Sequence, residues 1–438
     1  MFSKPFMSNR LKTLRLAGGL VWRIAFVGLP AAQLAATAAE EQSLSNQAEA
    51  ATAPAAATPD NSSFDDKATG GWWGGRQRLE TAGLSLNAQL VLEGFNNFQG
   101  GVDTGADGAS TFDLNLALDT EKVFNWKGGK FYADLQDHAG QDPSTALTGD
   151  LQVFDKLNSP SYLQLFELWY QQELFDGSLR LKLGKVDANT EFSVVDNGLP
   201  FLNSATQVTP TITPFPTTPD PMPSADVFFT PIKSWYASFG VSYANRSDTF
   251  GDFTGHPQSI QPTDNGMLFI GETGLLWQHA PFLDANGNLK AGAWGHTGTF
   301  SQLDGGQQSG SDGCYAIFDQ TLWQPVGEPE QSRGLRTFLE TGHTQSSMSV
   351  IDWNTAGGVT WSGPLALRPD DVLGFSSNYA HLSQQARLSH SYELALEWLY
   401  QATLTKWATL MPDVQFIIHP GGQYPDAVVG TLDLTIQF

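Results

Sequence analysis

The sequence predicts an all-β fold, a transmembrane antiparallel β-barrel of about 16 strands, on three observations. An export signal opens the chain, segments of alternating polarity recur along most of its length, and the last segment ends on Phe438. In that last segment, 427–438, polar side chains such as Thr431 and Asp433 alternate with apolar ones such as Leu432 and Leu434. A closed barrel in a bilayer accounts for this pattern, because its last strand pairs with its first and lies between lipid and water.

Composition agrees with a barrel and argues against several partners. Of the 438 residues, 41% are hydrophobic and 12% aromatic, but only 16% are charged, well below the usual quarter. The formal net charge of -22 argues against nucleic acid as a partner, because no basic stripe exists to neutralise phosphates. Cys314 is the single cysteine, which rules out an intramolecular disulfide and a cysteine-based zinc site. We expect no metal and no cofactor.

The first residues have the features of a secretory signal peptide. Five basic residues, from Lys4 to Arg23, precede an apolar run over 24–36, and an A-x-A pattern follows at 36–38. We therefore predict a signal peptide over 1–39. Residues 40–70 are rich in Ala, Thr, Ser and Pro and predict a disordered linker. Residues 71–438 then form the barrel, and no stretch in them reaches the eighteen apolar residues of a membrane-spanning helix.

Each predicted strand has apolar residues on one face and polar residues on the other. A soluble sandwich alternates too, but here the polar faces repeatedly carry full charges, and the apolar faces carry aromatic residues such as Trp398 and Tyr400 near strand ends. About fifteen segments fit period two. They are 84–95, 111–120, 130–138, 161–173, 178–187, 234–244, 267–278, 288–299, 314–323, 333–343, 352–362, 371–382, 391–402, 406–418 and 427–438.

The connections predict where a further strand lies. A bacterial single-chain barrel with both ends in the periplasm has an even number of strands, so we expect a sixteenth within 245–266. The tight connections at 175–178 and 402–405 then fall on the periplasmic side, together with Phe438. The longest connection, 188–233, is rich in Pro and Thr and too long for a plain loop. Our hypothesis is that part of it folds into the lumen and narrows the pore; a flexible external loop is the alternative.

Four blocks in order resemble the carbohydrate-selective porin (OprB-like) family of Gram-negative outer membranes. They are "GGWWGGRQRLETAGLSL" at 70–86, "FELWYQQELFDGSLRLKLGKVDANTEF" at 166–192, "GNLKAGAWGHTGTF" at 287–300 and "HSYELALEWLYQATLTKWATLMPDVQFIIHPGG" at 390–422. The resemblance covers roughly 70–438, although the stretch 198–225 matches no block of the family. It implies a sixteen-stranded barrel in the cell outer membrane, through which sugars and other small solutes diffuse.

A sugar pore needs polar groups that exchange hydrogen bonds with hydroxyls, aromatic faces for the C–H faces of sugars, and a constriction. Strand alternation proposes which side chains face the lumen. We expect Trp169 to stack on sugars, or else to pack under the long connection, Arg180 and Lys182 to shape the electric field, and Glu393, Glu397, Asp413 and Gln415 to form an opposing acidic wall. The complete predicted lining is Glu93, Asp134, Gln136, His138, Glu167, Trp169, Gln171, Arg180, Lys182, Glu393, Glu397, Asp413 and Gln415.

The leading hypothesis is thus a passive outer-membrane porin for sugars. A general porin that prefers cations is the alternative that the net charge favours, and a secreted β-rich carbohydrate-binding or hydrolytic protein is a third. We expect no enzyme, because no G-x-S-x-G, H-E-x-x-H, P-loop or dinucleotide motif is present. The terminal Phe438 resembles the signal that the barrel assembly machinery recognises. Homotrimers are common among porins, and the sequence leaves a monomer and a homotrimer open.

Overall fold

A computed structural model describes residues 66–244, 252–254, 266–279, 285–327 and 332–438. The predicted signal peptide and residues 40–65 lie outside the described residues. Residues 66–70, which we assigned to the linker, contact the barrel, since the backbone N–H of Ala68 donates to the carbonyl of Gln437 over 2.8 Å. No helix among the described residues is long and apolar enough to cross a membrane.

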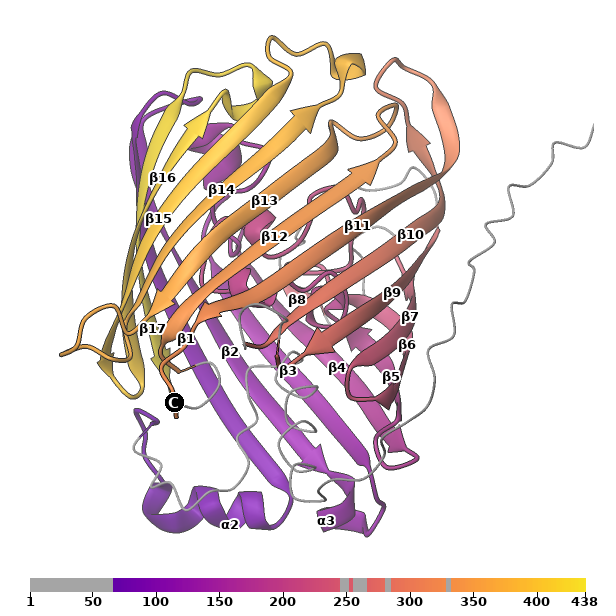
Figure 1. Cartoon of the computed structure of the whole chain (residues 1–438), viewed down its shortest axis with the longest axis vertical. Coiled ribbons are helices and arrows are strands. Elements are labelled where there is room, and N and C mark those ends of the chain that lie inside the picture. The colour runs from indigo at the N-terminus through magenta and orange to yellow at the C-terminus, as the bar shows by residue number, and fades with distance from the viewer. Residues whose placement is uncertain (1–65, 245–251, 255–265, 280–284, 328–331) are drawn as a thin grey trace, which may run out of the picture. The chain divides into compact units, whose positions relative to one another are not determined.

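In the described residues, sixteen strands form one closed antiparallel ring in which each strand pairs with its neighbours in the chain (Figure 1). The ring closes where β17 pairs with β1, with Glu93 opposite Asp433, which confirms the predicted barrel. Its strands are β1 (Leu84–Gln99), β2 (Gly105–Asp119), β3 (Gly129–Ala139), β4 (Tyr162–Leu174), β5 (Leu179–Val186), β6 (Met222–Ile232), β7 (Trp235–Tyr243), β9 (Met267–Trp277), β10 (Gly287–Ser301), β11 (Gln307–Trp323), β12 (Gly334–Thr344), β13 (Ile351–Ser362), β14 (Val372–Leu382), β15 (Tyr392–Thr405), β16 (Ala408–Ile418) and β17 (Ala427–Gln437).

The sixteenth strand is β6, so the predicted position within 245–266 was wrong. The described part of that stretch holds only β8 (Asp252–Thr254), which pairs with β4 outside the ring, and Gly266. β6 lies inside the segment read as a loop because of its Pro and Thr content. Its two prolines, Pro223 and Pro231, lie near its ends, where the loss of one inter-strand hydrogen bond destabilises the sheet least.

The turns and strand ends differ slightly from the prediction. The tight turn at 175–178 is confirmed, whereas β15 continues through 402–405 and turns at Lys406–Trp407 instead. β1, β2, β10 and β11 extend several residues beyond the alternating segments. In β2 and β11 the added residues, 105–110 and 307–313, are mostly glycine, alanine and polar residues on both faces, so alternation fades there.

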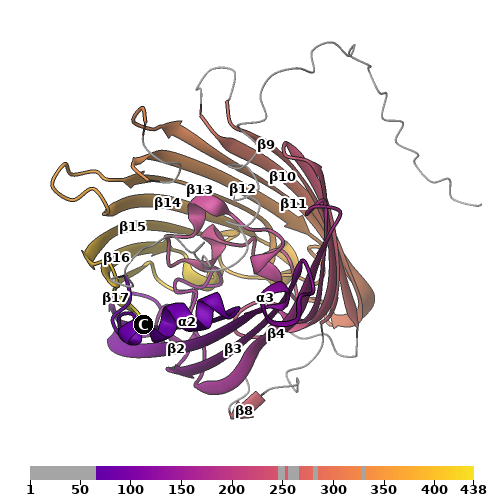
Figure 2. The same ribbon diagram turned by 90° about the horizontal axis from the view of Figure 1, so that it is seen from below.

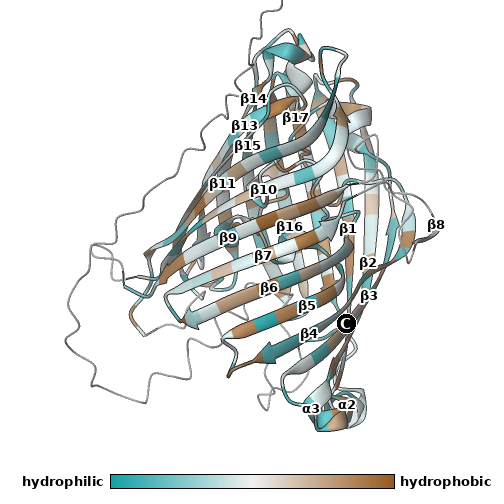
Figure 3. Cartoon of the chain, turned by 90° about the vertical axis from the view of Figure 1, so that its right-hand side faces the viewer, coloured by the Kyte–Doolittle hydropathy of each residue, from teal (hydrophilic) through white to brown (hydrophobic). Residues whose placement is uncertain are grey.

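Apolar side chains face outward and polar ones face the lumen, as the alternation predicts. Figure 3 shows hydrophobic and hydrophilic residues interspersed along the strands. On β15, for example, Trp398 is 42% exposed on the outer face, while Glu393 and Glu397 are fully buried inside. Large apolar side chains that project outward from the ring include Leu92, Phe112, Phe131, Leu183, Val227, Phe239, Phe269, Leu289, Leu339, Phe375, Trp398, Phe416 and Leu432. The outer face therefore suits lipid and the inner face suits water.

The two rims of the barrel differ. One rim, here the helix rim, carries α2 (Gly75–Thr81), α3 (Thr120–Phe124), the turns at 175–178 and 406–407, and the C-terminus (Figure 1). The opposite rim, here the loop rim, carries the connections 140–161 and 187–221. Phe438 continues the seam, because its N–H donates to the carbonyl of Ala88 over 2.8 Å.

Candidate functional site in the lumen

Two connections of the loop rim fold inward and lie inside the ring (Figure 2). We call residues 150–158 and 187–213 the inner layer. Phe192, Phe201 and Leu202 of this layer are almost fully buried. They pack on inward side chains of the barrel that include Ile270, Ile317, Phe338 and Leu399. Part of the predicted connection 188–233 thus lies in the lumen, because its apolar side chains pack there against apolar side chains of the barrel.

Short-range contacts shape the inner layer into single turns. Asp187 and Asn203 begin two such turns, at 188–190 and 204–206, and their side-chain oxygens accept N–H groups of Asn189 and Ala205 at 2.9 and 3.0 Å. Gly198 lies so close to the backbone that a Cβ there would be 1.9 Å from the carbonyl oxygen of Thr206. A side chain at this position would therefore push the two turns apart.

Carboxylates of β9 and β11 accept backbone N–H groups of the inner layer. Glu272 accepts the N–H of Ser193 over 2.9 Å and is also held by the hydroxyls of Tyr236 and Tyr315. Asp319 accepts the N–H of Asn197 over 2.9 Å. Such bonds satisfy the buried carboxylate and also the backbone N–H groups of the inner layer, which would otherwise lack hydrogen-bond partners inside the barrel.

β15 uses two carboxylates in the same way. Glu393 accepts the N–H groups of Leu151 and Gln152, each over 2.9 Å, and that of Gly421 over 2.6 Å. Glu397 accepts the N–H of Leu202 over 2.6 Å. The inner layer is therefore attached to the barrel from β9 round to β15.

The predicted acidic wall is consequently covered. Glu393, Glu397, Asp413 and Gln415 face inward as predicted, but their exposure is between 0 and 2%. They bind the inner layer or one another and leave no polar edge for a passing solute. We call the inward residues that hold the inner layer, namely Glu272, Asp319, Glu393, Glu397 and Gln415, the covered wall.

Arg180 and Lys182 converge on a single carboxylate of the inner layer. The Arg180 guanidinium donates to both oxygens of Glu191, at 3.0 and 2.8 Å, and the Lys182 ammonium also pairs with this carboxylate. Burial alone would raise the pKa of Glu191, but Lys182 and Arg180 outweigh burial and lower it. The predicted cations thus face the lumen with their field partly neutralised, and 17% of the Arg180 side chain stays exposed.

Trp169 is held between other side chains. The Tyr132 ring stacks on it with centroids 4.8 Å apart, and the Lys182 ammonium lies 4.1 Å from its centroid. Only 5% of Trp169 is exposed, so a sugar would have to displace one of these neighbours in order to stack. Of the predicted residues beside it, Glu167 accepts the N–H of Asp187 over 3.0 Å, and Gln171 accepts a hydrogen bond from Arg180 over 3.1 Å.

The predicted residues of β3 form a polar network with their neighbours. Gln136 donates to Asp113 over 2.7 Å and accepts from the hydroxyl of Tyr162 over 2.5 Å. His138 lies between the Thr111 hydroxyl and the Ser159 carbonyl, each 2.9 Å away, and so ties β3 to the connection 140–161. Asp134 is buried, and its Oδ1 has no hydrogen-bond partner among the described residues.

Glu93 faces another carboxyl of the inner layer. It is buried on β1 beside Asp155, with Asp433 and Lys156 close enough to interact electrostatically. Burial raises the pKa of Asp155 to about 6, and repulsion from Asp433 adds to this. This group differs from the covered wall, because here two acidic side chains meet each other instead of an amide.

A strip of half-buried polar residues on β17, β1 and β2 is not covered. Cross-strand register places Asn87 opposite Asn115, Gln89 opposite Asp113 and Thr435 opposite Val91. Among the described residues none of the strip hydrogen-bonds to the inner layer. We call this strip the open wall; its members are Asn87, Gln89, Asp113, Asn115 and Thr435.

The predicted lining omitted the open wall. Its residues do fall on the polar faces of the alternating segments, so the sequence held that signal. The sequence did not indicate which part of the inner surface the inner layer covers. That depends on contacts between residues far apart in the chain, such as Leu202 and Glu397.

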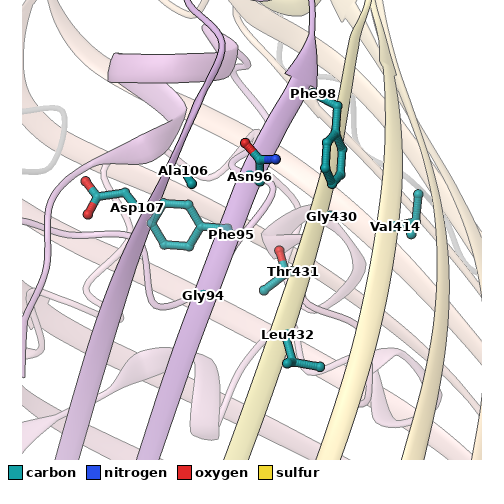
Figure 4. A pocket seen from close by; sticks show the side chains of 10 residues that line it. All are labelled: Gly94, Phe95, Asn96, Phe98, Ala106, Asp107, Val414, Gly430, Thr431 and Leu432. Carbon is teal, nitrogen blue, oxygen red and sulfur yellow. The ribbon is translucent and has the colours of Figure 1, made fainter.

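A separate depression lies on the outer face, where Phe98, Val414 and Leu432 surround Gly94 and Gly430 (Figure 4). These residues come from β1, β16 and β17, and all but Gly430 are well exposed. The depression belongs to the lipid-facing surface and not to the lumen.

Comparison with protein families gives one match over most of the chain. Residues 103–438 match the carbohydrate-selective porin, OprB family. A relative, Porin B of Pseudomonas aeruginosa, is 25% identical over an alignment of 427 residues, which covers 83% of this chain and 90% of the relative.

Solved structures with the same fold include OprB of Pseudomonas putida at two pH values. The high-pH structure has a TM-score of 0.74 at 20% identity and covers 87% of this chain and 100% of that chain. The low-pH structure has a TM-score of 0.58 at 18% identity, with 86% and 100% covered. At these identities the likeness concerns the fold alone.

Proposed function

Because the chain belongs to the carbohydrate-selective porin, OprB family, we propose that it is an outer-membrane channel through which sugars and other small solutes diffuse passively. The helix rim then faces the periplasm and the loop rim the outside, as in other barrels with long external connections. The family indicates a channel and not an enzyme, and we propose no catalytic role for any residue.

The uncovered polar side chains of the open wall are the observation that supports sugars as the solute. Its side chains are amides, a hydroxyl and one carboxyl, which can donate and accept hydrogen bonds as a sugar loses water. Two groups of opposite charges elsewhere in the lumen are paired: Glu191 faces Arg180 and Lys182, and Lys290 binds Asp196 over 2.8 Å. At the open wall a neutral polar solute therefore meets several weak partners.

Passage requires that each interaction be weak. A solute that binds a channel tightly blocks it, whereas several sites of low affinity allow the solute to move on. Exchange of one hydrogen bond to water for one to Asn87, Gln89 or Asn115 is worth only about 0.5 to 1.5 kcal/mol, as for most hydrogen bonds between neutral groups. The open wall thus suits selective diffusion better than capture.

A general porin that prefers cations is the second candidate. One observation favours it: Glu93, Asp155, Asp433 and Asp413 lie near one another, with Lys156 as the nearby cation. If these carboxyls ionise in the open channel, they would attract cations whatever the open wall does.

Flux through purified protein in liposomes tests the proposal. We would compare glucose, a disaccharide, a neutral amino acid and salts, and titrate single-channel current with sugar. The proposal expects sugar entry that declines with size and a current that sugar blocks. Ion conductance without sugar block, together with a reversal potential that favours cations, would support the second candidate instead.

Two further interactions are part of the proposal. Phe438 lies at the seam of the barrel and at the helix rim, where the barrel assembly machinery can read it from the periplasm. Whether the barrel works as a monomer or a homotrimer is testable by its mass in detergent.

A further inference from the structure

The two segments of the inner layer meet at one place. The N–H of Lys156 donates to the carbonyl of Leu202 over 2.9 Å, and the N–H of Ser204 donates to the carbonyl of Val153 over 2.9 Å. These two bonds join segments that leave the loop rim separately. The junction packs on the inner face of β15 and β16, directly over Glu397 and Gln415.

Gln415 bonds to both segments at once. Its Oε1 accepts from the Asn203 side-chain amide over 3.1 Å, and its Nε2 donates to the Phe154 carbonyl over 2.7 Å. The side chain is fully buried, so these two bonds satisfy an amide that would otherwise lack water. The uncharged amide accepts from one segment and donates to the other at the same position, which an ionised carboxylate cannot do because it only accepts.

Glu397 holds the same turn from the neighbouring strand. Its Oε1 accepts the N–H of Leu202 over 2.6 Å, and its Oε2 accepts the Ser376 hydroxyl over 3.2 Å. Bonds between a carboxylate and backbone N–H groups are stronger than bonds between neutral partners, more so inside a barrel wall without water. Glu397 fixes the height of the turn in the lumen, and Gln415 fixes the second segment to it.

We infer that Glu397 and Gln415 are positioning residues that clamp the two segments into one unit and thereby set the largest solute that the lumen admits. This inference rests on the proposed function, in which the lumen is the path. The reason is mechanical: the clamp is the point where the two segments share a partner on the wall. Without it, the segments stay joined by the bonds of Lys156 and Ser204, but their junction loses its hydrogen bonds to β15 and β16 and can move away from the wall.

Isosteric and truncating variants test the clamp. Gln415→Glu keeps the acceptor for Asn203 but places a carboxylate against the Phe154 carbonyl, so it should detach Phe154 from β16 and widen the passage, while Glu393 still holds Leu151 and Gln152. Glu397→Ala should release the turn at 202–203, whereas Glu397→Gln keeps an acceptor for Leu202 and should behave like the natural protein. Asp226→Asn is the matched control, because this buried inward carboxyl accepts from Ser224 of its own strand over 2.8 Å.

The readout is the size limit of single channels, measured by the exclusion of polyethylene glycols of increasing mass, together with conductance. The inference expects that Gln415→Glu and Glu397→Ala admit larger polymers and conduct more, while Glu397→Gln and Asp226→Asn keep the natural limit. An unchanged limit in both Gln415→Glu and Glu397→Ala would overturn it. Because the polymer is not a sugar, a changed limit in a channel without sugar block would keep the clamp and reject the proposed solute.

Variants that fail to form a barrel are recognised by the loss of heat-dependent migration in gels. Hydrogen exchange of the natural protein in detergent then tests the inference without any variant. If Glu397 and Gln415 clamp the two segments, the backbone amides over 150–158 and 199–206 should exchange slowly and together. Fast exchange, or exchange at independent rates in the two segments, would overturn the inference.

Discussion

The covered wall and the open wall face the same lumen but use different side chains. The covered wall, from β9 to β16, is rich in carboxylates whose oxygens accept amides of the inner layer, as Glu272 and Glu397 do. The open wall, on β17, β1 and β2, consists mainly of uncharged polar side chains such as Asn87 and Gln89, which have no partner in the inner layer among the described residues. A charge that faces the lumen therefore does not by itself mark a solute contact.

The difference has a physical cause. Loop segments inside a barrel expose backbone N–H groups that must find acceptors, and a carboxylate is the strongest acceptor a strand can offer. Carboxylates thus collect where the inner layer lies. A solute that must leave again requires weaker partners, and amides and hydroxyls supply these on the opposite side.

Glu191→Ala is expected to have the largest effect, because it removes the partner of the buried Lys182 and of the partly exposed Arg180. Loss of one member of a buried ion pair costs about 3 to 5 kcal/mol. We expect a lower unfolding temperature and, since Arg180 and Lys182 stay charged, a shift of the reversal potential toward anions. The double variant with Lys182→Met should recover part of the stability. If Glu191→Ala alters neither quantity, the three residues do not form the ion pair described.

Phe201→Ala tests whether the inner layer is held by packing as well as by carboxylates. Phe201 is fully buried, with its ring centroid 5.7 Å from that of Phe338, and such truncations cost about 3 to 5 kcal/mol. We expect the loss to appear as faster hydrogen exchange over 199–206, with the barrel intact. Leu199→Ala in the same layer is the control, because Leu199 is 47% exposed. Equal effects of the two variants would contradict a packed inner layer.

Asp155 gives the contact with β1 a pH dependence. Because burial raises its pKa to about 6, protonation favours the folded inner layer. This contribution is fully present below pH about 4, the range of a free aspartate, and is lost as pH rises through about 6. Hydrogen exchange over 150–158, corrected for intrinsic rates, should therefore be slower at pH 5 than at pH 7, with Glu93, Asp433 and Lys156 as the charged neighbours.

Asp155→Asn is the control for this dependence, since it resembles the protonated side chain at every pH. The difference between pH 5 and pH 7 should shrink in this variant. A difference of the same size would assign the dependence to another group.

How far sequence predicts this molecule depends on whether a feature is local. Strand alternation is local, so the barrel, its seam at Phe438 and the inward face of Glu397 or Lys182 were predicted. β6 was missed because prolines near its ends and the Pro/Thr-rich stretch before it imitate a loop. The covering of Glu393, Glu397 and Gln415 could not be predicted, because it follows from contacts with residues 195 to 242 positions away.

Gln89→Ala is expected to have the smallest effect on stability and a specific effect on solute. Gln89 is half-buried on the open wall and has no side-chain hydrogen bond among the described residues, so the barrel should unfold as before. Loss of one neutral hydrogen bond is worth about 0.5 to 1.5 kcal/mol, which raises the sugar concentration for half-block by up to about ten-fold. The same change at Gln415 would instead alter the size limit and leave the affinity of admitted sugars unchanged. If Gln89→Ala and Gln415→Ala had the same effect on block and size limit, the two walls would not be distinct.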